Sequence, residues 1–180
     1  MTGQPVFLIG FMGSGKSTLG HAVSEAAGIS FTDLDHFIEA GAGMSVPEIF
    51  GRYGESEFRR LEREALRRVA ATPQLIACGG GTPCQQGNME LMNDTGITVW
   101  LEAPVEKLVE RLLLYPGDRP LITGKSASEL RQYVADTLKE RSRHYSKARF
   151  RFDASRLDTP RELAESTAKF IDIYLKGTTL

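Results

Sequence analysis

The chain has 180 residues, a hydrophobic fraction of 41% and a formal net charge of −1 at pH 7. This length predicts one domain with a real core, and the balanced charge excludes a global field that would recruit nucleic acid or an anionic membrane. Cys78 and Cys84, together with three scattered histidines, form neither a disulfide framework nor a zinc pattern. The N-terminus does not have the pattern of a signal peptide, and no apolar run approaches membrane-spanning length, so we expect a cytoplasmic protein.

Short apolar runs alternate with longer helical patterns along the whole chain. The apolar runs predict strands over 6–10, 30–33, 74–78, 97–101 and 150–153. The helical patterns cover 16–27, 35–41, 46–50, 55–70, 86–94, 104–114, 127–146 and 160–175. This alternation is typical of an α/β protein whose parallel sheet is covered by helices on both faces. Ligands of such sheets bind beyond the carboxyl ends of the strands, so the residues that follow each strand are candidates for chemistry.

The first strand leads into the pattern G-x-x-x-x-G-K-[ST], which runs from Gly10 to Ser17. A predicted strand precedes this P-loop motif and a predicted helix follows it, which is the context that the motif requires. Its glycines let backbone N–H groups face a phosphate, and the start of the helix adds partial positive charge. Lys16 can then reach the outer phosphates, and the Ser17 hydroxyl can bind Mg²⁺. The motif predicts triphosphate binding but says little about the phosphoryl acceptor.

The second predicted strand ends in two acids, Asp33 and Asp35, separated by one residue. Alternation along an extended chain would point both carboxylates in the same direction. Phosphoryl transfer needs one acid that holds Mg²⁺, directly or through water, and one that accepts the proton of an attacking hydroxyl. A solvated loop in which Asp35 caps the next helix explains the same two residues equally well.

Three further segments contain residue types that suit an anionic ligand. The glycines at 79–81 follow a buried strand and either expose backbone amides to a ligand or form a permissive turn. The helix at 55–70 carries mostly surface i,i+4 charge pairs, although one inward Arg would bind a carboxylate. Segment 115–126, rich in Pro and Gly, suits either a mobile lid that brings Arg119 to the phosphates or a plain surface loop. Arg141, late in a long helix, fits a structural and a binding role equally.

Together these motifs resemble those of the shikimate kinases, in the same order and spacing, over about residues 5–175. Beside the P-loop they comprise D-x-D at 33–35, F-R-R-x-E at 58–62, G-G-G at 79–81, R-P-L-I-T-G at 119–124 and E-R-x-x-x-Y at 140–145. The P-loop is shared with many families, whereas the combination is specific.

The resemblance implies a fold like that of the nucleoside monophosphate kinases. This is a P-loop three-layer α/β sandwich in which helices flank five parallel strands in the order 2-3-1-4-5. Residues 1–180 would form a single domain, with a mobile lid at about 115–126 and a substrate-binding helical region at about 34–62.

The resemblance also implies an activity, in which ATP and shikimate give ADP and shikimate 3-phosphate on the route to chorismate and the aromatic amino acids. The implied catalytic residues are Lys16, Asp35 and Arg119, and Mg²⁺ would be held by Ser17 and, through water, by Asp33. The implied ATP-binding residues are Gly13, Ser14, Gly15, Lys16, Ser17, Thr18, Arg111, Arg119 and Arg156. The implied substrate-binding residues are Asp35, Arg59, Glu62, Gly79, Gly80, Gly81 and Arg141, with Arg59 and Arg141 on the shikimate carboxylate and Asp35 on the ring hydroxyls.

Two other functions remain open at this point. Another small-molecule kinase of the same fold, acting on gluconate or a nucleoside monophosphate, would share the P-loop, and gluconate is also a hydroxylated carboxylic acid. A nucleotide-dependent switch is a different class, although the Asn-Lys-x-Asp element of guanine-specific GTPases does not occur in the chain. No apolar run ends in Asp-Glu, so the resemblance implies that the acid role passes to Asp33. Thr82, Pro83 and Cys84 follow the glycines, at a point where members of the family differ. No long unpaired apolar stripe is evident, so we expect a monomer.

Overall fold

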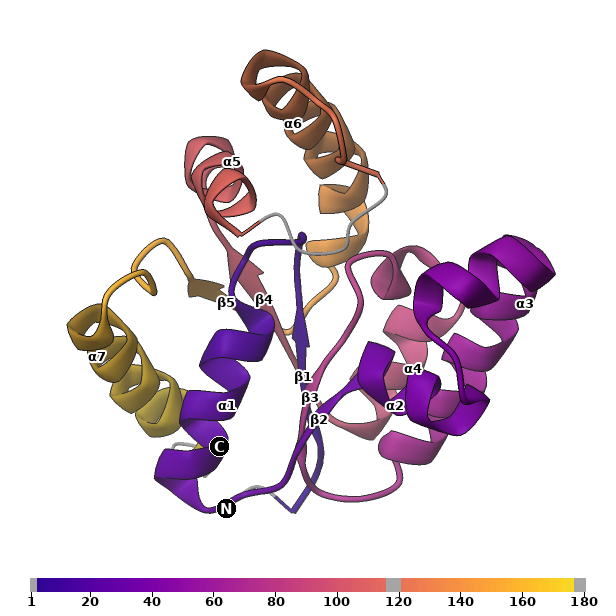
Figure 1. Ribbon diagram of the computed structural model, residues 1–180. Coiled ribbons are helices and arrows are strands. Elements are labelled where there is room, and N and C mark those ends of the chain that lie inside the picture. The colour runs from indigo at the N-terminus through magenta and orange to yellow at the C-terminus, as the bar shows by residue number, and fades with distance from the viewer. Residues whose placement is uncertain (1–2, 116–120, 177–180) are drawn as a thin grey trace.

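The structure of the protein is a computed structural model that describes residues 3–115 and 121–176. Within these segments five parallel strands form one sheet in the order β2-β3-β1-β4-β5 (Figure 1). The strands are β1 (Val6–Ile9), β2 (Phe31–Asp33), β3 (Leu75–Ala77), β4 (Ile97–Glu102) and β5 (Phe150–Asp153). The predicted α/β class and the strand order 2-3-1-4-5 are therefore confirmed.

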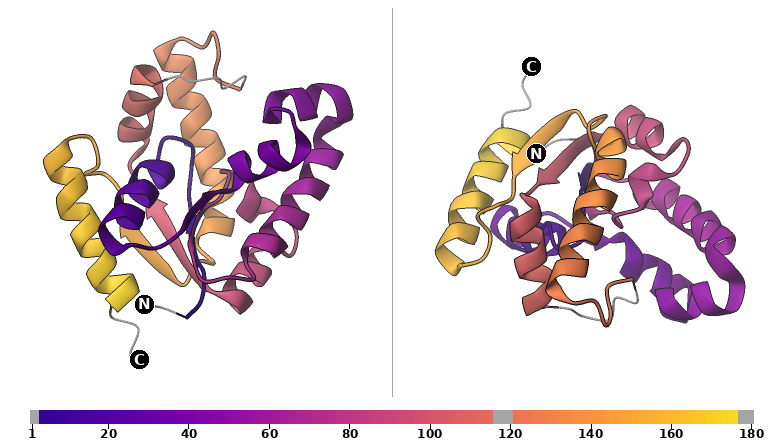
Figure 2. Two further views of the ribbon diagram at one scale, coloured as in Figure 1. Left: turned by 60° about the horizontal axis from the view of Figure 1, so that its bottom comes forward. Right: turned by 90° about the horizontal axis from the view of Figure 1, so that it is seen from above.

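Helices cover both faces of this sheet and give three layers (Figures 1 and 2). The α-helices are α1 (Lys16–Ala27), α2 (Leu34–Ala42), α3 (Val46–Val69), α4 (Asn88–Thr95), α5 (Val105–Leu114), α6 (Ala127–Tyr145) and α7 (Pro160–Phe170). A 3₁₀ turn, η1 (Thr82–Cys84), and a π-helical turn, η2 (Ile171–Lys176), complete the described elements. Within the described residues, no helix combines the length and the apolar character needed to cross a membrane.

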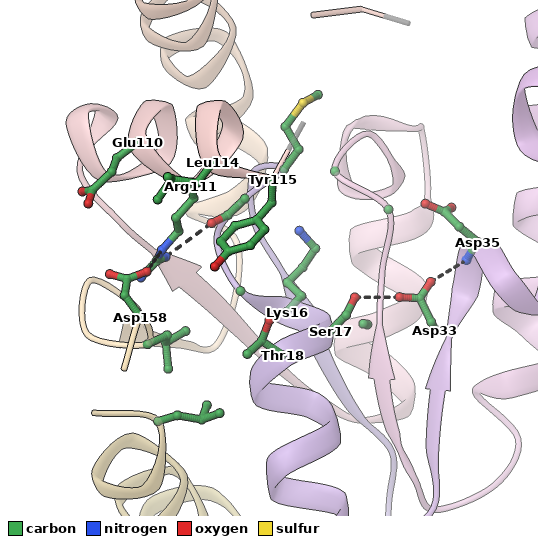
Figure 3. Close-up of a pocket in the computed structure, with 18 of the residues that line it drawn as sticks. Lys16, Ser17, Thr18, Asp33, Asp35, Glu110, Arg111, Leu114, Tyr115 and Asp158 are labelled. Atoms are coloured by element: carbon green, nitrogen blue, oxygen red, sulfur yellow. Dashed lines mark hydrogen bonds and ion pairs between the residues drawn. The ribbon is translucent and has the colours of Figure 1, made fainter. Parts of the chain in front are cut away.

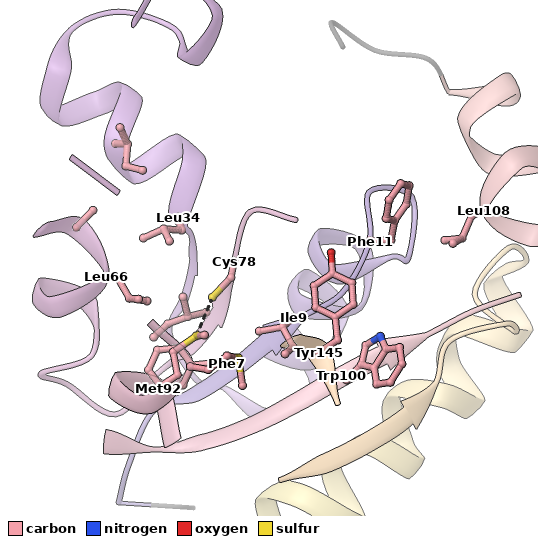
Figure 4. Close-up of a cluster of buried hydrophobic side chains, with 14 of the residues drawn as sticks. Phe7, Ile9, Phe11, Leu34, Leu66, Cys78, Met92, Trp100, Leu108 and Tyr145 are labelled. Atoms are coloured by element: carbon pink, nitrogen blue, oxygen red, sulfur yellow. Dashed lines mark hydrogen bonds between the residues drawn. The ribbon is translucent and has the colours of Figure 1, made fainter. Parts of the chain in front are cut away.

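The central strand β1 divides the core into two clusters. Val6 and Leu8 pack with side chains of α1 and α7 on one face, whereas Phe7 and Ile9 pack with side chains of α3, α4 and α6 on the other (Figure 4). Successive side chains of a strand point to opposite faces, so a strand covered on both sides must be apolar at every position. All residues of β1 are 1% exposed or less, as the continuous apolar run predicts.

Helix α3 joins two segments that the sequence predicts as separate helices. Its start has a capping box, in which the Ser45 hydroxyl accepts from the Glu48 N–H and the Glu48 carboxylate accepts from the Ser45 N–H. Gly54 then leaves the helical region, with φ 78° and ψ 175°, before helical geometry resumes. Only glycine adopts such angles without strain, so the break between the two predicted helices is encoded by this residue.

Tight packing at Gly20 of α1 yields a test of the core. A Cβ at Gly20 would lie 2.3 Å from Cε2 of Phe31, whereas a Cβ at Gly41 of α2 would meet nothing within 4 Å. We expect Gly20→Ala to lower the free energy of unfolding by about 1–3 kcal/mol through overpacking. Gly41→Ala should instead raise it by about 0.5 kcal/mol, because alanine loses less backbone entropy in a helix. Urea unfolding of both variants checks the pair, and a stable Gly20→Ala protein would contradict this packing.

Candidate active site

The P-loop of residues 10–17 connects β1 to α1 and lies at the carboxyl edge of the sheet. Gly13 and Gly15 have φ of 78° and 91°, a left-handed region that residues with side chains rarely adopt. Because Gly15 has no side chain with which to cap α1, the first N–H groups of the helix stay available to an anion. The loop therefore has the shape and the partial charge that phosphate binding requires.

Lys16 and Ser17 begin α1 and project into the cavity beside the loop (Figure 3). The Lys16 Nζ donates to the carbonyl oxygens of Gly10 and Phe11, both at 2.9 Å. The Ser17 hydroxyl donates to Oδ2 of Asp33 at 2.7 Å. A hydroxyl and a carboxylate oxygen are ligand types that Mg²⁺ prefers, so these two side chains fit a magnesium site next to bound phosphates.

The two acids at the end of β2 and the start of α2 occupy different conformations. Asp33 keeps extended angles and caps α2, and its carboxylate accepts the N–H of Asp35 at 3.1 Å. Asp35 itself lies in the first turn of α2, because the helix begins at Leu34. The expectation of an extended D-x-D segment is therefore wrong, and so is the alternative in which Asp35 is the cap. Both carboxylates nevertheless line the cavity, because the first turn of α2 starts directly at the end of the strand.

Asp35 sits in an electrostatic environment that disfavours its charge. Burial raises the pKa of its carboxyl from 3.8 to about 6, with further upward contributions from Asp33 and Glu62 and a smaller opposing one from Lys16. A carboxylate with a pKa near the working pH can both exist in its charged form and accept a proton. Asp35 is thus suited to hold or receive the proton of a substrate hydroxyl.

The glycine loop, residues 79–81, brings three polar side chains from three helices to one place. A Cβ on its first, second and third glycine would lie 3.0, 3.3 and 3.0 Å from Oδ1 of Asp35, Nη1 of Arg141 and Nη2 of Arg59. Side chains at these positions would displace the polar groups, which explains three consecutive glycines. The loop is therefore the point at which a carboxylate and two guanidinium groups meet beside the P-loop.

A buried carboxylate supports this arrangement from behind. Glu62 is 1% exposed, and its Oε2 accepts from Nη1 of Arg59 at 3.0 Å. Its other oxygen accepts from the hydroxyl of Thr82 at 2.6 Å. Arg59 also pairs with Glu55 one turn earlier, at 3.2 Å. The resemblance implies that Glu62 belongs to the site. Its contact with Thr82 joins residues 20 positions apart, so no local sequence pattern predicts it.

The P-loop side of the site opens into a cavity of about 760 Å³ that continues toward α5 and the segment after β5 (Figure 3). Besides the two acids, Gly79, Gly80 and the P-loop residues 12, 13 and 15–17, it is lined by Ala77, Cys78, Glu110, Arg111, Leu114, Tyr115, Leu157, Asp158, Thr159, Pro160 and Leu163. Arg59, Gly81 and Arg141 are not among its lining residues. Thr18 also lines it, whereas Ser14 is 1% exposed and buried beneath the loop. The residues at 157–160 carry no motif, so sequence reasoning missed them, whereas Tyr115 begins the segment that the sequence predicts as a lid.

The two arginines expected near the adenine occupy unlike positions. Arg111 is buried, and its Nε donates to Oδ1 of Asp158 at 2.6 Å while Nη1 donates to the Gly13 carbonyl at 3.3 Å. It thereby ties the P-loop to the segment after β5. Arg156 is exposed, pairs with Glu165 at 3.3 Å, and is not among the residues that line the cavity. Its neighbours 157–160 reach the cavity instead.

Arg119 lies in the part of the expected lid that is outside the described residues. Residues 116–120 lie outside the described residues, so the lid expected at 115–126 is described only at its two ends. At one end Tyr115 lines the cavity, and at the other Ser126 caps α6 in a capping box with Glu129.

Comparisons with known proteins agree with this geometry. The family model described as shikimate kinase matches residues 12–172. A shikimate kinase of Parabacteroides distasonis is 45% identical over 86% of this chain and 90% of its own. A crystal structure of shikimate kinase from Bacteroides thetaiotaomicron has a TM-score of 0.90 at 37% identity, over 94% of this chain and 97% of that chain.

A second solved structure was determined with a ligand. The shikimate kinase from Acinetobacter baumannii, in complex with shikimate, has a TM-score of 0.85 at 30% identity and covers 99% of this chain and 97% of that chain. A gluconokinase from Sinorhizobium meliloti has a TM-score of 0.55 at 19% identity, a likeness of fold alone.

The raised pKa of Asp35, from 3.8 to about 6, predicts a pH-dependent stability difference. Keeping this carboxyl charged at pH 8 costs up to about 3 kcal/mol, since one pKa unit corresponds to about 1.4 kcal/mol. We therefore expect Asp35→Asn to raise the free energy of unfolding at pH 8. The gain should shrink as the pH falls through 6, because the wild-type carboxyl becomes protonated.

Urea unfolding at pH 8 and pH 4.5 measures this difference. The control is Asp94→Asn, which changes an exposed carboxyl of α4 and should have little effect at either pH. An equal effect of Asp35→Asn at both pH values would show that burial of its charge is not the cause.

Proposed function

The chain belongs to the shikimate kinase family, and from that premise we propose that it transfers the γ-phosphoryl group of ATP to the 3-hydroxyl of shikimate. The products are ADP and shikimate 3-phosphate, a step toward chorismate and the aromatic amino acids. The observation that carries the proposal is the convergence of Asp35, Arg59 and Arg141 on a glycine loop beside a P-loop. Shikimate has a carboxylate at one end of its ring and hydroxyls at the other, which matches this set of charges.

The substrate is held from two directions in this proposal. Arg59 and Arg141 bind its carboxylate, since guanidinium groups match planar oxygen pairs in a bidentate fashion. Asp35 accepts hydrogen bonds from the ring hydroxyls and receives the proton of the attacking oxygen. The bare backbone of Gly79, Gly80 and Gly81 lets the ring approach closely, and Glu62 keeps Arg59 in place. Orientation of this kind supplies much of what phosphoryl transfer requires from a protein.

ATP occupies the P-loop side of the cavity. Backbone N–H groups at 13–18 and the Lys16 ammonium bind the phosphates, and the start of α1 adds its partial positive charge. Ser17 and, through water, Asp33 would hold Mg²⁺, which when bound neutralises phosphate charge. Arg111, beside the P-loop, and Arg156 are proposed near the adenine, and the position of Leu157 and Asp158 in the cavity wall supports this location.

Several further expectations remain proposals on the same premise. Residues 1–180 act as one domain, with residues 34–62 as the substrate-binding region and residues 115–126 as a lid that delivers Arg119 to the phosphates. Such a lid would exclude water, which otherwise competes as phosphoryl acceptor. A monomer in the cytoplasm stays the expectation from the sequence.

The reaction itself is tested by ADP release from MgATP, measured with purified protein alone, with shikimate and with gluconate. We expect strong stimulation by shikimate only, because the chain belongs to the shikimate kinase family. Stimulation by gluconate would transfer the proposal to a related sugar-acid kinase. Tight ATP binding without stimulation by either acid would favour a different acceptor or a nucleotide-dependent binding role.

The carboxylate role of Arg59 is tested against its neighbour Arg60. Arg59→Ala should raise KM for shikimate roughly 10- to 100-fold and leave KM for ATP nearly unchanged, because a charge-assisted contact is lost on one substrate only. Arg60 is exposed and pairs with Glu57 and Glu64 at 2.6 Å on the outer face of α3. Arg60→Ala should therefore change neither constant more than about twofold. Equal losses for both substrates in Arg59→Ala would argue against the assignment.

A further inference from the structure

Two buried hydroxyl groups hold the glycine loop from opposite sides. The Thr82 hydroxyl donates to Oε1 of Glu62, and the Tyr145 hydroxyl donates to the carbonyl oxygen of Gly80, each at 2.6 Å. Both residues are 0% exposed. Neither residue is among those that line the cavity; the Thr82 contact leads to Arg59, and the Tyr145 contact is made to the loop that Arg141 approaches.

The Thr82 contact is linked to Arg59 through Glu62. Thr82 occupies one oxygen of Glu62 and leaves the other for Nη1 of Arg59, at 3.0 Å. Thr82 is itself fixed, because its N–H donates to the carbonyl of Gly79 at 3.1 Å and its carbonyl accepts from Nδ2 of Asn88 at 3.0 Å. Without the hydroxyl, both Glu62 oxygens would be free to chelate Arg59 and turn its guanidinium away from a ligand.

The Tyr145 contact lies close to Arg141. The two residues lie four positions apart on α6, so their side chains share one face of the helix. The Tyr145 ring lies 5.7 Å from Trp100, and Figure 4 shows it beside Ile9 with its hydroxyl directed away from the sheet. The Arg141 guanidinium lies 5.7 Å from the Phe11 ring of the P-loop. This face of α6 therefore contacts the glycine loop through Tyr145 and the P-loop through Arg141.

We propose that Thr82 and Tyr145 are positioning residues that set the spacing of the Arg59 and Arg141 guanidinium groups across the glycine loop. This inference rests on the proposed function and deepens it. The distance between the two guanidinium groups would favour an acceptor whose single carboxylate contacts both arginines. Helices α3 and α6 carry one arginine each, and each helix is hydrogen bonded to the glycine loop or to the residue that follows it. Thr82 acts through Glu62, and Tyr145 acts through the backbone of the loop.

The variants Thr82→Val and Tyr145→Phe remove one hydroxyl each and preserve the shape of the side chain. Each should raise KM for shikimate roughly tenfold, because the contact of one arginine with the shikimate carboxylate is weakened. The values of kcat and of KM for ATP should stay within about twofold of the wild type. Thr82→Ser should restore the wild-type KM. The methyl ester of shikimate lacks the charge that the arginines bind, so its KM should be the same in the variants and the wild type.

Matched controls separate positioning from general stability. Thr98 and Tyr174 are also buried, and their hydroxyls donate to Oδ1 of Asn93 at 2.6 Å and to the carbonyl of Arg151 at 2.9 Å. Thr98→Val and Tyr174→Phe should lower the melting temperature and leave KM for shikimate unchanged. A change in KM that merely followed stability would appear in these controls as well.

The outcomes distinguish this inference from the function on which it rests. Absence of shikimate-stimulated ADP release in the wild type would overturn the proposed function and this inference together. An active wild type, with an unchanged KM for shikimate in the folded variants, would overturn the positioning roles alone. An equal rise in KM for shikimate, for its methyl ester and for ATP would also overturn the positioning roles. If one of the two variants does not fold, the other decides.

Discussion

The buried carboxylate of Glu62 is the constraint on which the acceptor side of the site depends. A charge that is 1% exposed must be paired and hydrogen bonded, because desolvation without partners costs several kcal/mol. Its two oxygens are taken by Arg59 and Thr82, which belong to different parts of the chain. The pairing thus ties helix α3 to the loop after β3. The same charge also contributes to the raised pKa of Asp35.

The topology of the sheet explains why these groups meet at all. Strand β3 lies between β1 and β2, and all three strands run in parallel. The glycine loop after β3 therefore lies between the P-loop after β1 and the acids after β2. Nucleotide and acceptor sites become neighbours without any long connection, and only the arginines must be supplied by more distant helices. The active region is in this sense a consequence of strand order, completed by α3 and α6.

The free site carries an electrostatic cost that its substrates are suited to relieve. Asp33, Asp35 and Glu62 gather negative charge at one edge of the sheet, and burial adds to the effect on Asp35. A cation next to Asp33, and hydroxyl donors next to Asp35, would each stabilise the charged forms. The crowded charges lower the stability of the free protein, and ligands that relieve them gain affinity. This is common where polar groups are held in place for catalysis.

The sequence by itself determined the features that depend on near neighbours: the P-loop with its left-handed glycines, the buried strands, the break at Gly54 and the capping box at Ser45. Each is set by backbone angles or by residues three to four positions apart. Only the tertiary structure decided that Asp33 rather than Asp35 caps α2, that residues 157–160 rather than Arg156 line the cavity, and that Thr82 and Tyr145 hold the glycine loop. The last two contacts span 20 and 65 positions. Their partners are chosen by how helices pack on the sheet, which no local pattern encodes.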